Sequence, residues 1–143
     1  MAETKYGKYI VKEPIVKSMF EQVVAPQVHI SGEKDCAGAN FSMGWSFITQ
    51  PFLMVDDAHT HDFDQILFFL GGNPRDVNDF KAEVELFLGE EGEKHIINTT
   101  SSVYIPKGLI HCPLNVRIVD KPFVFIDIVL SPQHDVRRKP IQA

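Results

Sequence analysis

Cysteine is scarce in this chain, as are the features of a secreted protein. Its 143 residues include two cysteines, Cys36 and Cys112, too few for a disulfide framework. Residues 1–14 alternate Lys, Tyr and Glu without an apolar core, so no secretory signal is expected. We therefore expect a cytoplasmic protein with both thiols reduced.

Long apolar runs and an excess of positive charge are also missing. The longest uninterrupted apolar stretch is Ile66–Leu70, whereas a membrane-spanning helix needs about 20 such residues. The chain carries 14 Lys and Arg against 19 Asp and Glu, a net charge of −5, and nucleic-acid-binding surfaces are basic. We expect neither a membrane nor a nucleic-acid partner.

What the chain does contain is a series of short apolar and β-branched runs separated by turn sequences. With 44% hydrophobic and 23% charged residues, its composition is that of one globular domain. A short helix is expected over Ile15–Val24, between Pro14 and Pro26, and the polar segment Gly72–Lys81 is expected to be the largest loop. Strand spacing of about 8–12 residues is typical of an antiparallel sandwich or barrel. The expected strands are Val28–Ile30, Phe41–Ile48, Phe52–Val55, Gln65–Leu70, Ala82–Leu88, Lys94–Asn98, Ser102–Ile105, Val116–Val119 and Phe123–Leu130.

Two histidines at close spacing are the first candidate metal ligands. His59 and His61 are two residues apart, so on a strand their side chains share one face. Gln65 follows an Asp62–Asp64 turn and begins the next strand, where its amide oxygen could complete one edge of a site. The alternative is a surface histidine pair beside a solvated glutamine.

A third histidine comes much later, at the end of a turn. His111 lies three residues after Gly108 in the segment Pro106–His111, and Asn115 follows. Three imidazoles and a neutral oxygen suit a divalent transition metal, with Fe, Mn, Ni, Zn and Cu not distinguished. For His111 alone, the alternative is a core histidine bonded to a carbonyl.

Together these residues resemble the two motifs of the cupin family. The first motif runs His-x-His, a short gap, Glu, six residues, Gly; here it is met by His59, His61, Gln65 and Gly72. The second runs Pro-x-Gly, two residues, His, three residues, Asn, and is matched in full by Pro106, Gly108, His111 and Asn115. The resemblance implies an all-β fold, an antiparallel jelly-roll β-barrel with a metal inside. It implies one domain over residues 1–143, with the barrel at about 40–130 and an N-terminal extension at 1–27.

Three positions depart from the family pattern. Leu53 and Thr100 stand where a glycine usually precedes each motif, and Gln65 replaces the usual Glu ligand. The change to Gln keeps an oxygen donor but removes one negative charge, so the metal would bind less tightly and act more as a Lewis acid. If Gln65 does not ligate, a three-histidine site with more open positions remains.

Other polar side chains could take part in a reaction. Glu83 and Glu85 share one face of a strand and could reach the cavity as a general base, or could simply face solvent. Tyr104 flanks the second motif and could bind an anionic group. Cys112 follows His111 directly, so on a regular strand it points to the opposite face and serves core packing.

The resemblance leads to an expected function and an alternative. We expect a metal-dependent enzyme that binds a small substrate with carboxylate, keto or sugar-like oxygens, for dioxygenase, isomerase or lyase chemistry. The alternative is a non-catalytic metal-binding or ligand-sensing module, since the fold does not determine the reaction. A homodimer is expected in either case, as chains of this type and size commonly pair.

Overall fold

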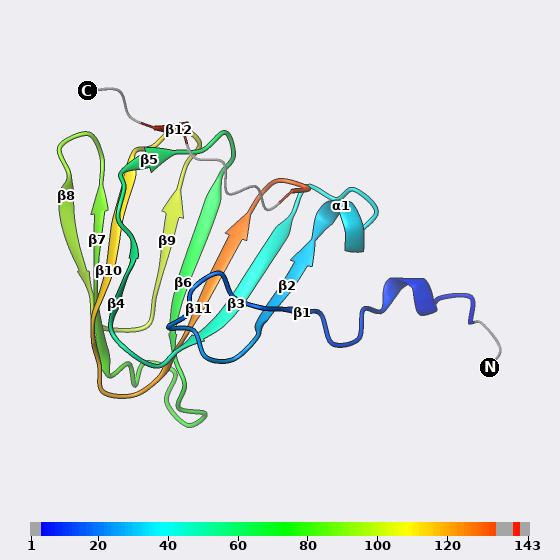
Figure 1. Ribbon diagram of the computed structural model, residues 1–143, viewed down its shortest axis with the longest axis horizontal. Coiled ribbons are helices and arrows are strands. Elements are labelled where there is room, and N and C mark those ends of the chain that lie inside the picture. The colour runs from blue at the N-terminus through cyan, green and yellow to red at the C-terminus, as the bar shows by residue number, and fades with distance from the viewer. Residues whose placement is uncertain (1–3, 134–138, 141–143) are drawn as a thin grey trace.

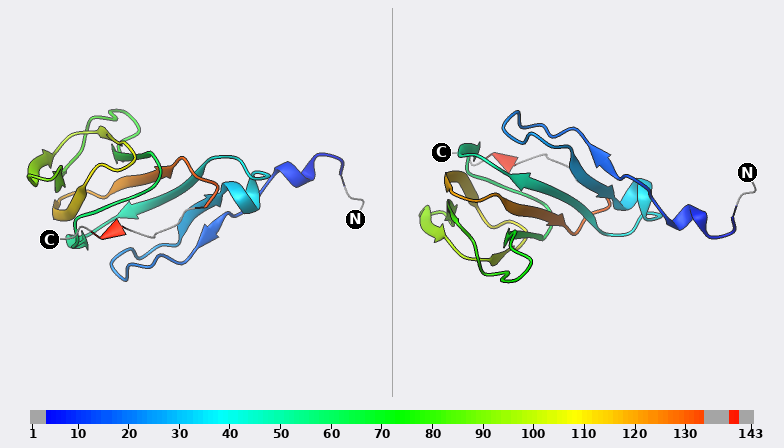
Figure 2. Two further views of the ribbon diagram at one scale, coloured as in Figure 1. Left: turned by 90° about the horizontal axis from the view of Figure 1, so that it is seen from above. Right: turned by 90° about the horizontal axis from the view of Figure 1, so that it is seen from below.

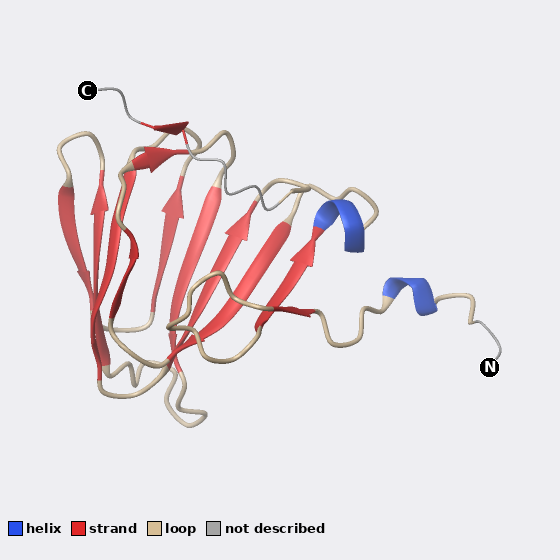
Figure 3. Ribbon diagram, viewed as in Figure 1, coloured by secondary structure: helices blue, strands red, loops and turns tan. Residues whose placement is uncertain are grey.

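The computed structural model describes residues 4–133 and 139–140, and within them the chain is almost entirely antiparallel β-sheet (Figures 1 and 3). One six-stranded sheet has the order β1 (Ile15–Val16), β2 (Gln27–Ser31), β3 (Ser42–Ile48), β11 (Phe123–Val129), β6 (Gln65–Gly71), β9 (Ser101–Ile105). The other has the order β12 (Lys139–Pro140), β5 (His59–Thr60), β10 (His111–Val119), β7 (Ala82–Leu88), β8 (Glu93–Ile97), with β4 (Phe52–Val55) paired to β10. This is the jelly-roll architecture expected from the sequence.

The core lies between the two sheets, because alternate residues of each strand point inward. On β6 the inward set is Gln65, Leu67 and Phe69, and on β7 it is Ala82, Val84 and Leu86. The largest fully buried side chains come from both sheets and are Phe69, Phe123, Ile48, Leu86, Ile105 and Leu114. At one end of this core the buried residues are polar instead, and that end holds the candidate site.

Most of the expected strands are present, two of them with the predicted bounds, Phe52–Val55 and Ala82–Leu88. The strand expected at Val116–Val119 is longer and begins at His111. The two-residue strands β1, β5 and β12 were not predicted, because two residues carry no periodic pattern. The loop expected over Gly72–Lys81 is confirmed, since no strand or helix lies between β6 and β7, but residues 17–26 between β1 and β2 form an equally long one.

The helix expected over Ile15–Val24 is wrong. Ile15 and Val16 form β1, and the residues up to β2 are irregular. Pro14 and Pro26 leave too few residues for a stable isolated helix, and tertiary contacts take over: Val23 is buried in the core and Phe20 packs on Phe52 at 5.7 Å between ring centroids. The helical turns of the described residues are η1 (Gly7–Tyr9) and α1 (Gly32–Asp35) instead.

The two ends of the described chain lie at opposite sides of the molecule. The N-terminal residues extend away from the sheets beyond α1, while β12 pairs with β5 (Figures 1 and 2). Within the described residues, no helix is long and apolar enough to cross a membrane.

Candidate metal centre

Three buried histidines meet at one end of the barrel. His59 lies on β5, His61 follows it, and His111 begins β10 directly opposite His59 in the strand register. Their side chains are 3%, 8% and 3% exposed, and one ring nitrogen from each lies within 4.8 Å of the other two. The sequence placed these residues in one site, and the tertiary structure brings them together at distances that a single ion could bridge.

Backbone carbonyls orient two of the three imidazole rings. The Nδ1 atom of His59 lies 2.8 Å from the carbonyl oxygen of Asp57, and Nδ1 of His111 lies 2.9 Å from that of Leu109. Because a carbonyl oxygen only accepts, Nδ1 must carry the hydrogen in each ring, which leaves the lone pair on Nε2. Outer hydrogen bonds of this kind orient metal-binding histidines in proteins.

The two motifs are tied together by backbone hydrogen bonds. The Gly108 amide donates to the His61 carbonyl at 3.1 Å, and the Lys107 amide donates to Asp64 Oδ1 at 2.8 Å. Gly108 has a φ of +83°, which favours glycine. This explains why the Pro-x-Gly turn carries His111 to the first motif, although the two are far apart in sequence.

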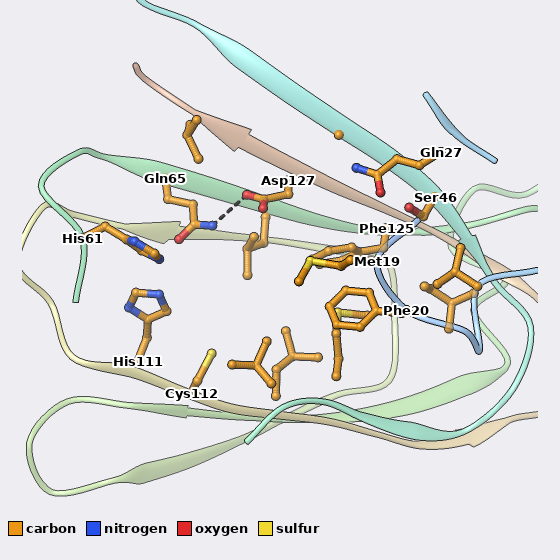
Figure 4. Close-up of a pocket in the computed structure, with 18 of the residues that line it drawn as sticks. Met19, Phe20, Gln27, Ser46, His61, Gln65, His111, Cys112, Phe125 and Asp127 are labelled. Carbon is orange, nitrogen blue, oxygen red and sulfur yellow. Dashed lines mark hydrogen bonds between the residues drawn. The ribbon is translucent and has the colours of Figure 1, made fainter. Parts of the chain in front are cut away.

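Gln65 presents an unsatisfied oxygen in the same region. Its Nε2 donates to Asp127 Oδ1 at 2.7 Å, while its buried Oε1 has no hydrogen-bond partner among the described residues. A carboxylate only accepts, so Asp127 fixes which end of the amide carries the oxygen. In Figure 4 that oxygen lies on the side of His61 and His111.

The donor set fits a divalent transition metal. An unsatisfied buried acceptor costs about 1–3 kcal/mol, and an ion held by His59, His61 and His111 would satisfy Gln65 Oε1 as well. The four donors are neutral, and the carboxylate of Asp127 stands just behind the amide. A negative charge, which Glu supplies in the family's first motif, is therefore still present here, but on Asp127, which contacts the Gln65 amide.

A cavity of about 130 Å³ opens from this cluster into the barrel. Its polar residues gather mainly at the histidine end (Figure 4). The Phe63 ring stacks on His61 there, with 4.7 Å between ring centroids. The remaining walls are mostly apolar and include Met19, Phe20, Val23, Ile48, Met54, Leu67, Leu114 and Phe125. Three of these, Met19, Phe20 and Val23, belong to the segment between β1 and β2.

The two candidate glutamates do not line this cavity. Glu83 and Glu85 alternate with the buried Ala82, Val84 and Leu86 on β7, so they lie on the outer face of the sheet. Glu85 pairs with Lys94 at 2.6 Å, and Glu83 pairs with Arg117 at 2.8 Å. The hydrogen bond from Lys94 lowers the pKa of Glu85 despite some desolvation. Both are therefore placed as surface ion pairs, away from the histidines.

Tyr104 also lies away from the cavity. It is 60% exposed and pairs in register with Ile66 on the outer face of β6. Partial desolvation and then the negative charge of Asp64 raise its pKa. Its hydroxyl is thus a protonated surface group and not part of the site.

Cys112, unlike these three residues, does line the cavity, so the prediction that it points away from the site is wrong. The expectation that it points away from His111 assumed a regular strand, but the register of β10 is irregular between His111 and Leu114, and Cys112 has a φ of +79°. Its side chain consequently lines the cavity beside His111 (Figure 4). Asp127 was missed for another reason: it belongs to neither motif, and only the β6–β11 pairing brings it to Gln65.

Comparison of the fold with solved structures gives a consistent answer. The polyketide cyclase RemF from Streptomyces resistomycificus matches with a TM-score of 0.54 and 11% identity, over 82% of this chain and 71% of that one. An oxalate oxidase in complex with glycolate matches with a TM-score of 0.51 and 12% identity, over 80% and 54%. The fold is that of the cupins.

The comparisons establish this cupin fold and no particular activity. Peruvianin-I, a cysteine peptidase from Thevetia peruviana latex, matches with a TM-score of 0.58 and 10% identity, over 91% of this chain and 76% of that one. The chain spans 28% of an oxalate decarboxylase that it also matches. No family model and no curated protein matches the sequence.

Proposed function

We propose that this protein is a metal-dependent small-molecule enzyme of the cupin type. In this proposal one divalent transition metal, drawn from Fe, Mn, Ni, Zn and Cu, is held by His59, His61, His111 and Gln65. The reaction is of the dioxygenase, isomerase or lyase class, on a small substrate that reaches the metal through a carboxylate, keto or other oxygen group.

The observation that carries the proposal is the convergence of three buried histidines, two of them oriented by backbone carbonyls, and a buried amide oxygen on a cavity. Buried acceptors are rarely left unsatisfied in folded proteins, yet Gln65 Oε1 is buried without a partner among the described residues. The same end of the cavity contains the carboxylate of Asp127. Binding groups, a charged group and space for a ligand therefore coincide.

The chain's own residues would divide the work. The imidazoles and the Gln65 oxygen would hold the ion, which, when bound, supplies Lewis-acid activation of a substrate oxygen. Asp127 holds the Gln65 amide at 2.7 Å and lines the cavity, where it is placed to accept a proton from a bound ligand. Apolar walls line the rest of the cavity, and a surrounding of low dielectric constant strengthens electrostatic contacts with the ligand.

Enzymes among the matched structures support this proposal without choosing the reaction. A cyclase and an oxalate oxidase share the fold, and folds carry many chemistries. The second candidate is a non-catalytic metal-binding or sensing module. It is favoured by one observation: Glu83, Glu85 and Tyr104 lie outside the cavity, which leaves Asp127 as the lining carboxylate.

Metal analysis of the purified protein tests the proposal. We expect near-stoichiometric metal in the wild type by elemental mass spectrometry, and its loss in His111→Ala. The matched control is His95→Ala, because His95 is 48% exposed and pairs with Glu93, away from the site. Turnover of carboxylate or keto substrates by the loaded protein then separates the enzyme from the binding module. Metal-free wild type after purification without chelators, and no uptake of added Mn²⁺ or Zn²⁺, would overturn the proposal.

A further inference from the structure

We propose that the cavity selects a ligand with one oxygen-bearing head and a compact apolar body about the size of a six-membered ring. This selection excludes sugars, which would place many hydroxyls against apolar walls, and small dicarboxylates, which would leave the apolar part empty. The inference rests on the proposed function for the contact of the head with the metal, and it narrows the substrate class of that site.

The first support is the division of the cavity into a polar end and apolar walls. His61, His111, Gln65 and Asp127 are gathered at one end (Figure 4), and His59 lies with the other two histidines. Beyond them the lining is largely hydrocarbon, from Ile48, Met54, Leu67, Leu114 and Phe125, with Met19, Phe20 and Val23 from the N-terminal segment. A ligand that fills this space therefore meets polar groups at its head and apolar side chains along its body.

The second support is size. The cavity volume is about 130 Å³, close to the roughly 150 Å³ of an apolar cavity that is known to bind benzene. Because this volume includes the polar end, it limits the whole ligand, head and body together, to about one substituted ring or a branched chain of similar volume. A two-carbon ligand such as oxalate would leave the apolar part empty and lose those contacts.

The third support is the cost of placing further polar groups against these walls. Each hydroxyl of a sugar would exchange water for hydrocarbon without a replacement hydrogen bond. The lining offers Gln27 and Ser46 at the far end, enough for one distal polar group but not for a polyol (Figure 4). At the metal end, Asp127 adds a negative charge that disfavours a second carboxylate on the ligand.

Calorimetric binding to Mn²⁺-loaded protein tests the inference with three probes. Benzoate has the head and the ring, acetate has the head alone, and oxalate has two heads and no body. We expect benzoate to bind at least about tenfold more tightly than acetate or oxalate, because burial of the ring adds apolar contact. Equal or weaker binding of benzoate would overturn the inference.

A pair of variants at adjacent positions shows whether the ring occupies the cavity. Leu67→Phe places extra volume on the inner face of β6, and Ile66→Phe places it on the outer face of the same strand. We expect Leu67→Phe to abolish the preference for benzoate while acetate and Mn²⁺ binding remain, and Ile66→Phe to keep the preference. If both variants keep it, the ring binds elsewhere and the inference is wrong.

The failure of this inference can be told apart from failure of the proposed function. Without metal uptake the proposed function fails, and the apolar part is then tested on metal-free protein with benzyl alcohol. A rise in the melting temperature of wild type that is absent in Leu67→Phe supports the apolar chamber, and no rise overturns it. With metal uptake but no preference for benzoate, the proposed function stands and this inference falls.

Discussion

At the scale of single residues, the position that departs most from the cupin pattern is also the one the structure explains best. Gln65 stands in place of the expected Glu, and its amide donates to Asp127 at 2.7 Å. A hydrogen bond to a carboxylate polarises the amide and increases the negative character of its oxygen. The donor set thus keeps a nearby negative charge, carried by a residue on another strand.

In the proposed metal site, this arrangement would make Asp127 a positioning residue for the ion. In Asp127→Asn the side-chain oxygen can still accept from Gln65, but the charge is lost, and outer-shell changes of this kind weaken metal binding about 10–100-fold. We expect a weakening in that range for Mn²⁺ or Zn²⁺, measured by competition with a chromogenic chelator. The double variant Gln65→Glu with Asp127→Asn places the negative charge on the candidate ligand itself and should recover the affinity. An unchanged affinity in Asp127→Asn, or no recovery in the double variant, would contradict this role.

At the scale of elements, the segment between β1 and β2 matters beyond its lack of regular structure. Its residues Met19, Phe20 and Val23 form part of the cavity wall. It is attached by the contact of Phe20 with Phe52 and by a hydrogen bond from Gln50 Nε2 to the Gln22 carbonyl at 3.1 Å. Part of the cavity wall is therefore supplied by a segment outside both metal motifs.

Two adjacent valines test how this segment is held. Val23 is 7% exposed, whereas Val24 is 70% exposed. Replacing Val23 by Asp removes the burial of one side chain, so we expect a loss of about 1.5–3 kcal/mol in the free energy of unfolding and faster tryptic cleavage at Lys17. Val24→Asp should change the stability by less than about 0.5 kcal/mol. Urea unfolding and timed proteolysis measure both effects, and equal behaviour of the two variants would show that the segment is not anchored by Val23.

At the scale of the whole molecule, the outer face of the sheet that contains β3, β11 and β6 is unusually apolar for a surface. The strand register aligns Trp45, Ile126 and Phe68 in one row across β3, β11 and β6, and Phe47, Val124 and Leu70 in the next. Phe47 is 47% exposed, and Trp45 Nε1 is buried without a hydrogen-bond partner among the described residues. Contiguous apolar patches of this kind mark interaction surfaces.

We propose that a second copy of the chain covers this face, as a homodimer. Light scattering after size exclusion should then give about twice the 16.2 kDa of one chain, and Phe47→Glu should give the monomer because it places a charge in the interface. The control is Ile118→Glu, at a 42% exposed position on the other sheet. A wild-type monomer, or a dimer that persists in Phe47→Glu, would exclude this interface.

Much of the barrel and of the site was predictable from local patterns. The strands Phe52–Val55 and Ala82–Leu88 have their expected bounds because their apolar or alternating residues are bordered by clear turns. The three histidines and Gln65 were predicted from the resemblance to the two cupin motifs, and the spacing of His59 and His61 places both on one strand face. The helix predicted over Ile15–Val24 is absent, because a segment this short between two prolines has a weak helical preference, and its tertiary contacts determine its conformation.

The sequence by itself therefore determined the fold class and the identities of the candidate metal ligands, since both follow from period-two alternation and from short motifs. Only the tertiary structure decided what surrounds them. The Asp127 hydrogen bond depends on pairing of β6 with β11, and the inward turn of Cys112 depends on an irregularity in β10. Each of these is set by contacts between residues far apart in the chain, which no local pattern encodes.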